Sequence, residues 1–150
     1  MEIREYTKER IDDVIAFEHI LREEENFWGW EIDDAYIRAV KASFESSRFE
    51  NAVSFLAYED GRVIGRIDAS LIPSHFDGSI KAYLDWICVV KSYRHKGAAQ
   101  ALMAHLRKEL KEKYGVNTLV ALIAGNPEAQ SFYRALENAE IRDEGIWIDL

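Results

Sequence analysis

Cysteine is nearly absent from this sequence: Cys88 is the only one, so the chain cannot form an internal disulfide bond. Cys88 lies in an apolar run, where a free cysteine is usually a buried and unreactive thiol. Linkers are missing too, because no repeat, low-complexity tract or stretch rich in Pro, Gly and Ser divides the 150 residues. We therefore expect residues 1–150 to form a single domain.

Long apolar runs are also lacking. The first residues, MEIREYTKERIDD, contain no stretch of the about 7–15 apolar residues that a signal peptide needs. No window approaches the roughly 18 apolar residues of a membrane-spanning helix. We expect a cytoplasmic protein with no membrane partner.

A surplus of positive charge is missing as well, since 19 Lys and Arg against 27 Asp and Glu give a net charge of −8. Binding of nucleic-acid phosphates needs Lys and Arg in excess along one face, so we expect no nucleic-acid partner. The acidic balance is compatible with a cationic small molecule. His19, His75 and His105 have no Cys or His neighbour at metal-ligand spacing, so we predict no metal.

The pattern of apolar residues predicts strands and helices in a mixed order. Strands are expected over residues 3–6, 52–58, 62–71, 82–90 and 118–124, with one or two more in the tail 141–150. Helices are expected over residues 8–25, 33–44, 99–114 and 127–136. Asp60-Gly61 between two strand-like runs is a strong hairpin signal. The runs 82–90 and 118–124 are nearly all apolar, as strands buried on both faces would be. This order indicates an α/β (α+β mixed) fold with helices covering a central sheet.

One hinge gathers basic and very small residues between a strand and a helix: Arg94, His95, Lys96, Gly97, Ala98 and Ala99. A helix N-terminus exposes unpaired amides and carries about half a positive charge. Small side chains would leave these amides accessible, and basic ones add positive potential, so the hinge is suited to hold a diphosphate. The alternative is an ordinary strand-to-helix turn with a solvated basic cluster. The hinge is neither a GxxxxGK[ST] loop nor a GxGxxG motif, which disfavours those nucleotide-binding classes.

The hinge at residues 94–99 resembles the R/Q-x-x-G-x-G/A motif of the GNAT superfamily of N-acetyltransferases, and it follows an apolar strand as it does in that family. Asn126, Ala129, Phe132 and Tyr133 are similar to the N-x-x-A-x-x-[LF]-Y pattern of the family's later helix. The resemblance is clearest from residue 52 to residue 139. It implies the GNAT fold, a mixed central sheet with two splayed strands and about four helices.

The sequence departs from the family's pattern at three places. Ala98 stands where a larger aliphatic residue is usual, and Ala99 replaces the commoner Gly. The frequent L-G-F after the tyrosine is here Leu136-Glu137-Asn138, in which Asn tolerates the left-handed conformation that ends a helix.

The resemblance implies acetyl-CoA as the donor, with its diphosphate on the amides of residues 94–99. It also implies that the pantetheine arm lies along the backbone of Ile87, Cys88 and Val89. Asn126 would hydrogen-bond this arm, and it could equally serve as a helix cap. Tyr133 matches the tyrosine that protonates the departing thiolate, and its alternative role is that of an aromatic residue on the buried face of the helix.

An acceptor amine must lose a proton before it attacks a thioester. For an amine with a lysine-like pKa of about 10.4, this step costs about 4.6 kcal/mol at pH 7. A carboxylate can assist it directly or through water. Asp85 is the only charged residue between Ala82 and Val90, which makes it the candidate base. Alternatively, its carboxylate faces solvent or pairs with an arginine.

In this family the acceptor usually meets the first two helices and their connection, here REEENFWGWEIDD. Acidic groups beside indoles suit a cation, so Glu24, Trp28 and Trp30 are candidate acceptor-binding residues. A solvated helix end with inward-packed aromatics is the alternative.

The segment 69–86 and the tail are loosely similar to aminoglycoside 3-N-acetyltransferases, so an aminoglycoside is the leading acceptor. Polyamines, protein or peptide amines, and a non-catalytic acyl-CoA-binding module stay open. Dimers are common in the family, and a homodimer is compatible with the sequence.

Overall fold

The structure is a computed structural model that describes residues 1–25, 30–142 and 145–149. The chain divides into two compact units, Met1–Val120 and Ala121–Leu150. The single domain expected over residues 1–150 stays a prediction.

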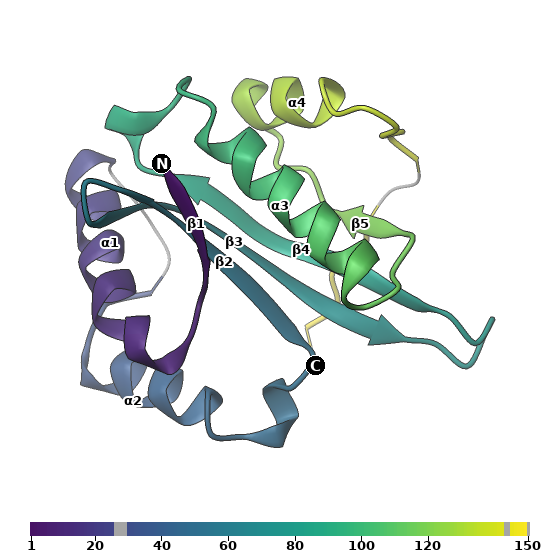
Figure 1. Ribbon diagram of the computed structural model, residues 1–150, viewed down its shortest axis with the longest axis horizontal. Coiled ribbons are helices and arrows are strands. Elements are labelled where there is room, and N and C mark those ends of the chain that lie inside the picture. Colours follow the sequence, from purple (N-terminus) through teal and green to yellow (C-terminus); the bar gives the residue numbers. More distant parts are fainter. Residues whose placement is uncertain (26–29, 143–144, 150) are drawn as a thin grey trace. The chain divides into compact units, whose positions relative to one another are not determined.

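The elements of the chain follow the predicted order up to the last helix (Figure 1). They are β1 (Glu2–Glu5), α1 (Ile11–Glu24), α2 (Asp34–Ser43), β2 (Ala52–Glu59), β3 (Arg62–Pro73), β4 (Ile80–Val89), α3 (Ala98–Glu112), β5 (Leu119–Ala121) and α4 (Pro127–Arg134). Short 3₁₀ turns at Lys8–Arg10, Ser47–Phe49 and Lys91–Tyr93 precede α1, β2 and the hinge before α3. The mixed α/β fold is confirmed.

The sheet has the strand order β1-β2-β3-β4-β5, and its first three pairs are antiparallel. The β2–β3 hairpin turns at Asp60 and Gly61, whose φ angles of 48° and 76° are those that a tight Asp-Gly turn requires. At the start of β4, the Ala82 amide donates a hydrogen bond of 2.9 Å to the Thr118 carbonyl, directly before β5.

Helices α1 and α3 cover opposite faces of this sheet. Gly65 of β3 lies against Leu102 of α3, and its neighbour Arg66 lies near Glu18 of α1. Successive side chains of a strand point to opposite faces, so the two helices lie on different sides. We call these sides the α3 face and the α1 face.

A β-bulge interrupts the pairing of β3 with β4. Asp68 is opposite Trp86, but the next residue, Ala69, is opposite Leu84, so Asp85 is an extra residue in β4. The extra residue resets the alternation of side chains along the strand. By this register Leu84 and Ile87 share the α3 face, and Trp86 lies on the α1 face.

The buried core of the first unit is mainly aliphatic. On α3 the fully buried residues are Ala98, Leu102, Met103, Leu106 and Leu110. On α1 they are Ile11, Val14, Phe17, Glu18 and Leu21, so only α1 buries a charged residue.

Two predictions about strands were wrong. Residues 118–124 do not form one fully buried strand, because β5 has only three residues and Val120 and Leu122 are 47% and 41% exposed. The tail shows no strand at residues 141–142 and 145–149, where Ile146 and Trp147 are 83% and 74% exposed. An apolar run does not by itself identify a buried strand, because a strand also needs a neighbouring strand whose main-chain groups are free to pair with it.

Helix α4 begins as predicted. The Asn126 side chain accepts a hydrogen bond of 2.8 Å from the Ala129 amide, and Pro127 is the first helical residue. Its apolar residues Ala129, Phe132 and Tyr133 are half-buried, whereas a buried stripe was expected.

Candidate active site

The end of β4 exposes main-chain groups on one edge. The Val90 amide donates to the Ile64 carbonyl at 2.9 Å, which fixes the phase of the antiparallel ladder. Along such a ladder the main-chain groups point alternately toward and away from the partner strand. Cys88, opposite Arg66, therefore directs its amide and carbonyl toward β3, and Ile87 and Val89 direct theirs to the other edge.

Of the three residues predicted to pair with a pantetheine arm, Ile87 and Val89 thus have the suitable main-chain direction. Cys88 does not, because its main chain belongs to the β3 ladder. Burial raises the pKa of the Cys88 thiol to about 11, so the thiol stays protonated near neutral pH, as expected of an unreactive cysteine.

The hinge after β4 leaves the N-terminus of α3 open. Gly97 has φ 86°, and its carbonyl accepts the first intrahelical hydrogen bond from the Ala101 amide at 2.9 Å. The amides of residues 98–100 come before that bond and have no partner within the helix. A Cβ atom built on Gly97 would meet no other atom within 4 Å. The space beside Gly97, where the helix begins, is therefore open.

The basic side chains of the hinge differ in their surroundings. Arg94 forms an ion pair with Glu25 at the end of α1, and its Nε donates to the Val89 carbonyl at 3.1 Å. Lys96 donates to the Ser92 carbonyl at 3.0 Å. His95 is exposed and has φ 59°. Arg94 thus connects α1, β4 and the hinge, while His95 and Lys96 face solvent.

Glu24 is also bound to this turn. Its carboxylate accepts hydrogen bonds from the Ser92 amide at 3.0 Å and from the Ser92 hydroxyl at 2.6 Å. These bonds lower the pKa of Glu24. Its carboxylate thus holds the turn before α3, and the role of Glu24 in binding the acceptor stays a prediction.

Trp30 lies beside two other aromatic rings. It stacks on Tyr36 with ring centroids 6.2 Å apart and meets Trp86 edge-on at 6.3 Å. Arg22 donates to the Trp30 carbonyl at 3.0 Å. Trp30 is 46% exposed, and the guanidinium carbon of Arg22 lies 5.7 Å from the centre of its ring. Trp28, the other predicted indole, lies outside the described residues.

Asp85 is the bulged residue of β4, and it is exposed. Trp86, which follows it, contacts Trp30. The predicted base and one predicted acceptor-binding residue are therefore both adjacent to Trp86.

The remaining candidates are on α4 in the second unit. Asn126 acts as the helix cap, which uses one side-chain oxygen. The Tyr133 ring packs edge-to-face against Phe132, with centroids 5.2 Å apart. The capping alternative for Asn126 is thus observed, whereas Tyr133 is half-buried and packs on its neighbour Phe132, and the roles of both residues toward a ligand stay predictions.

Sequence reasoning missed one charged group on the α1 face: Glu18, Arg66 and Asp68. The sequence of β3 contains the signal, because Arg66 and Asp68 lie two residues apart in a mostly apolar strand. Polar residues with that spacing share one face.

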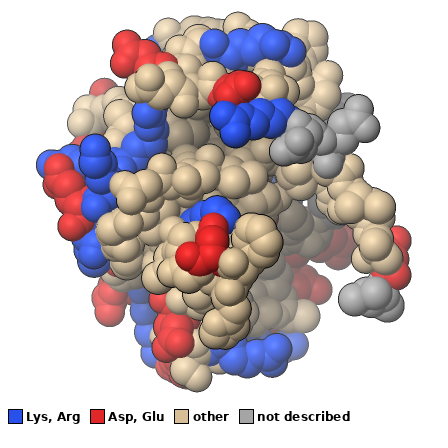
Figure 2. Space-filling model, turned by 90° about the vertical axis from the view of Figure 1, so that its right-hand side faces the viewer, with Lys and Arg blue, Asp and Glu red and all other residues tan. Residues whose placement is uncertain are grey.

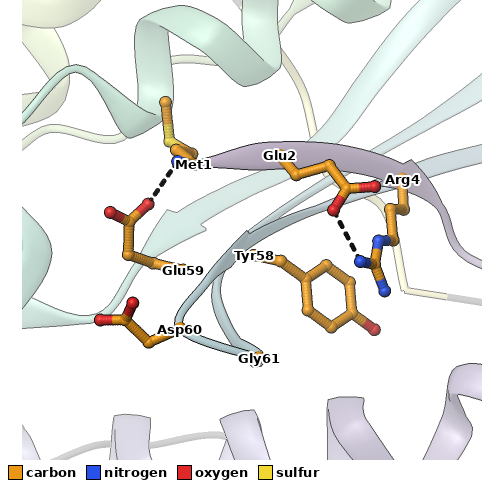
Figure 3. A pocket seen from close by; sticks show the side chains of 7 residues that line it. All are labelled: Met1, Glu2, Arg4, Tyr58, Glu59, Asp60 and Gly61. Carbon is orange, nitrogen blue, oxygen red and sulfur yellow. Dashed lines mark hydrogen bonds and ion pairs between the residues drawn. The ribbon is translucent and has the colours of Figure 1, made fainter.

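A hollow of about 260 Å³ lies elsewhere in the first unit (Figure 3). It is bordered by the start of β1 and by the β2–β3 turn, and its lining residues are Met1, Glu2, Arg4, Tyr58, Glu59, Asp60 and Gly61. The N-terminal amine pairs with Glu59 at 2.7 Å, and Arg4 pairs with Glu2 at 2.6 Å. No predicted site residue lines this hollow, and its charged groups are largely paired with each other.

Charges of both signs are interspersed over the face of the molecule seen in Figure 2. Within the described residues no three or more His, Cys, Asp or Glu side chains form a group that could hold a metal ion. Among the helices of those same residues, none has both the length and the apolar character for crossing a membrane.

A family model described as the acetyltransferase (GNAT) family matches residues 14–137, a range that includes parts of both units. No curated protein sequence matches this chain. Three solved structures illustrate the likeness in fold.

An aminoglycoside acetyltransferase, meta-AAC0020, from an uncultured soil metagenomic sample and in complex with sisomicin, has a TM-score of 0.82 at 14% identity, covering 99% of this chain and 95% of that one. A ribosomal-protein-alanine N-acetyltransferase from Brucella melitensis biovar Abortus 2308 has a TM-score of 0.75 at 18% identity, covering 100% and 99%. AAC(6')-Iy, in complex with the bisubstrate analogue CoA-S-monomethyl-acetylneamine, has a TM-score of 0.75 at 24% identity, covering 99% and 97%.

At these identities the neighbours share the fold, and the family is given by the matched model, which covers most of the chain. The chain belongs to the acetyltransferase (GNAT) family and is an acyltransferase.

Proposed function

We propose that this protein transfers the acetyl group of acetyl-CoA to a primary amine of a small cationic acceptor, with an aminoglycoside as the leading class. The observation that supports the donor best is the open space at Gly97, at the N-terminus of α3, where the amides of residues 98–100 have no partner within the helix. Amides at a helix N-terminus bind phosphate well, and these follow directly after β4. A neighbour of the same fold was solved with a CoA-containing bisubstrate analogue.

In the proposed binding mode the diphosphate of CoA lies on the amides at residues 97–100, with His95 and Lys96 adding positive potential. The pantetheine arm pairs with the main chain of Ile87 and with the Val89 amide, which point to the edge of β4 away from β3, whereas the Val89 carbonyl already accepts from Arg94. Arg94 and Glu24 hold the hinge in shape, because both are bonded within the protein.

In the proposed reaction, Asp85 accepts a proton from the acceptor ammonium, directly or through water. The amine nitrogen then attacks the thioester carbonyl carbon, the carbon–sulfur bond breaks, and the nitrogen releases a second proton as the amide forms. The CoA thiolate takes a proton, and the motif resemblance assigns Tyr133 as the donor of that proton.

The acceptor class is supported by the acidic protein and the exposed Trp30 ring next to Trp86. Three acidic groups near this region are already engaged: Glu24 bonds Ser92, Glu25 pairs with Arg94, and Asp33 caps α2. Glu23, Glu31 and Asp34 are the exposed acidic side chains left among those considered from sequence.

A protein N-terminal amine is the second candidate acceptor, because a ribosomal-protein-alanine N-acetyltransferase shares the fold with a TM-score of 0.75, the same as that of AAC(6')-Iy. Release of CoA in the presence of sisomicin, spermidine or an N-terminal alanine peptide distinguishes these acceptors. Turnover with the peptide alone would replace the aminoglycoside proposal and leave the donor proposal intact.

The donor site is tested with a matched pair of glycine variants. Gly97 and Gly115 lie at opposite ends of α3, both have positive φ, and neither has an atom within 4 Å of a built Cβ. Gly97→Leu should weaken CoA binding about 10- to 100-fold, because loss of one charge-assisted hydrogen bond costs about 1.5–3 kcal/mol. Gly115→Leu should leave CoA binding unchanged. Equal CoA affinity of both variants, measured by calorimetry, would place the diphosphate elsewhere.

The proposed base is tested with Asp85→Asn, which keeps the shape of the side chain. Turnover should fall about 10²- to 10⁴-fold while the dissociation constant of CoA stays the same. A turnover equal to that of the unmodified protein from pH 6 to about pH 9 would remove Asp85 from the mechanism.

A further inference from the structure

A layer of charged side chains is buried between α1 and the sheet, outside the residues assigned to the reaction above. Glu18 of α1 is 1% exposed, and Arg66 and Asp68 of β3 have side chains 17% and 14% exposed. Arg66 Nε lies 2.7 Å from Asp68 Oδ2, and Arg66 Nη2 donates to Asp68 Oδ1 at 2.8 Å. Arg66 Nη1 lies 3.7 Å from Glu18 Oε1. Arg66 therefore joins the sheet to the helix.

Neighbouring polar groups complete this layer. Glu18 Oε2 accepts from Arg22 at 2.7 Å, and Ser54 donates to Asp68 at 2.7 Å. Burial alone would lower the pKa of Arg66, but the charge and hydrogen bond of Asp68 raise that pKa above its ordinary value. The guanidinium is therefore always charged.

The layer is not fully satisfied. Among the described residues, Glu18 Oε1 and the Tyr6 hydroxyl are buried without a hydrogen-bond partner. A partly satisfied ionic layer is less stabilising than well-packed hydrocarbon of the same volume. A contribution to the stability of the fold thus explains this layer poorly. Its directional bonds indicate instead that side chains are held in a defined orientation at this place.

That place is the bulge of β4. In the sheet register Asp68 is opposite Trp86, the first residue after the extra residue Asp85, and Arg66 is opposite Cys88. The guanidinium carbon of Arg66 lies 5.7 Å from the centre of the Trp86 ring and 4.9 Å from that of Tyr6. Without the bulge, strict alternation would put Trp86 on the same face as Leu84. Arg66 therefore contacts the aromatic ring that the bulge places on the α1 face.

We propose that Arg66 is a positioning residue of the acyl transfer. Held by Asp68 and Glu18, it keeps Trp86 on the α1 face, and so it maintains the bulge that orients Asp85 and the main chain of Ile87. This role rests on the proposed function, in which Asp85 and Ile87 act on the substrates. Arg66 acts through Trp86, without contact with either substrate.

The test uses Arg66→Lys, which keeps the positive charge but loses the planar fork that grips Asp68. For acetyl transfer from acetyl-CoA to sisomicin, we expect kcat to fall about 10- to 100-fold, as a small misplacement of reacting groups does. We expect the CoA dissociation constant to change by a smaller factor than kcat, because the diphosphate hinge does not involve Arg66 and only the pantetheine contact at Ile87 depends on the bulge. An unchanged kcat would overturn the proposal.

A control separates positioning from general destabilisation. Leu106→Val removes one methylene from the buried α3 face, and it should lower stability without changing kcat. If Leu106→Val lowers kcat as much as Arg66→Lys at the same loss of stability, the effect is not specific to the bulge and the proposal fails.

A second measurement needs no substrate. Hydrogen exchange of the amides of residues 85–87 should speed up in Arg66→Lys, and the Trp86 indole N–H resonance, assigned with Trp86→Phe, should shift. An unmodified protein that neither binds CoA nor acetylates any amine would refute the proposed function, and these two measurements would still test Arg66. If both are as in the unmodified protein, Arg66 does not maintain the bulge.

Discussion

The α3 face and the α1 face of one sheet are built from different chemistry. The α3 face joins Gly65 and Ile67 of β3 to Leu102 and Leu106 of α3, all of them aliphatic or small. The α1 face carries the Glu18, Arg66 and Asp68 layer and the bond from the Tyr58 hydroxyl to Asp13, at 2.6 Å. Apolar burial is non-directional, whereas ion pairs and hydrogen bonds fix orientation. The comparison suggests that the α3 face supplies stability and the α1 face supplies geometry.

The largest effect is expected on the α3 face. Leu102 is 0% exposed, so Leu102→Ala should lower the free energy of unfolding by about 2–5 kcal/mol through lost burial and a cavity. Urea unfolding measures this, with the volume-conserving Leu102→Met as the control at less than about 1.5 kcal/mol. A loss below that of Leu102→Met would mean that the α3 face does not carry the stability assigned to it.

A smaller effect is expected from overpacking the same face. A Cβ on Gly65 would lie 3.1 Å from Leu102 Cδ1 and 3.2 Å from the Cys88 carbonyl oxygen. The backbone oxygen cannot move aside cheaply, so Gly65→Ala should cost about 1–3 kcal/mol of unfolding free energy. Gly61→Asn is the control, because Gly61 has open space and Asn tolerates its φ of 76°. If Gly65→Ala and the unmodified protein have the same free energy of unfolding, the atoms around Gly65 move aside at no measurable cost.

The smallest effect concerns the α1 face and depends on pH. Burial, together with the hydrogen bond to Asp13, raises the pKa of Tyr58 from 10 to about 12. A raised folded-state pKa gives stability that is fully present below pH 10 and is lost as the pH rises from 10 to 12.

Tyr58→Phe should therefore cost about 1 kcal/mol near pH 8 and should flatten the fall of stability between pH 10 and pH 12. Tyr6 and Tyr36 also have raised pKa values caused by burial, so part of the fall should persist. Urea unfolding at several pH values checks this. A pH profile identical to that of the unmodified protein would contradict the role of the Tyr58 bond.

The order of elements could be predicted because each has a local cause. Asp60-Gly61 suits the tight turn, Asn126-Pro127 begins α4, and small residues open α3 after the hinge. Local chemistry of this kind is written in neighbouring residues.

The partners of charged side chains could not be predicted in this way. Glu24 bonds Ser92 and Arg94 pairs with Glu25, and each pair joins residues more than 60 positions apart in sequence. The bulge at Asp85 was also hidden, because it exists only in the pairing of β4 with β3. Predicted roles that depend on a bound ligand, such as those of Asp85 and Tyr133, stay predictions.

Because of the bulge, the side chains of β4 on the α3 face belong to even-numbered residues before Asp85 and to odd-numbered residues after it. Deleting Asp85 would give one regular alternation, with Leu84 and Ile87 still on the α3 face and Trp86 still on the α1 face. The packing of both faces is thus compatible with a β4 that is one residue shorter, and a strand shortened in this way would keep both faces while it lost the exposed carboxylate that the bulge adds.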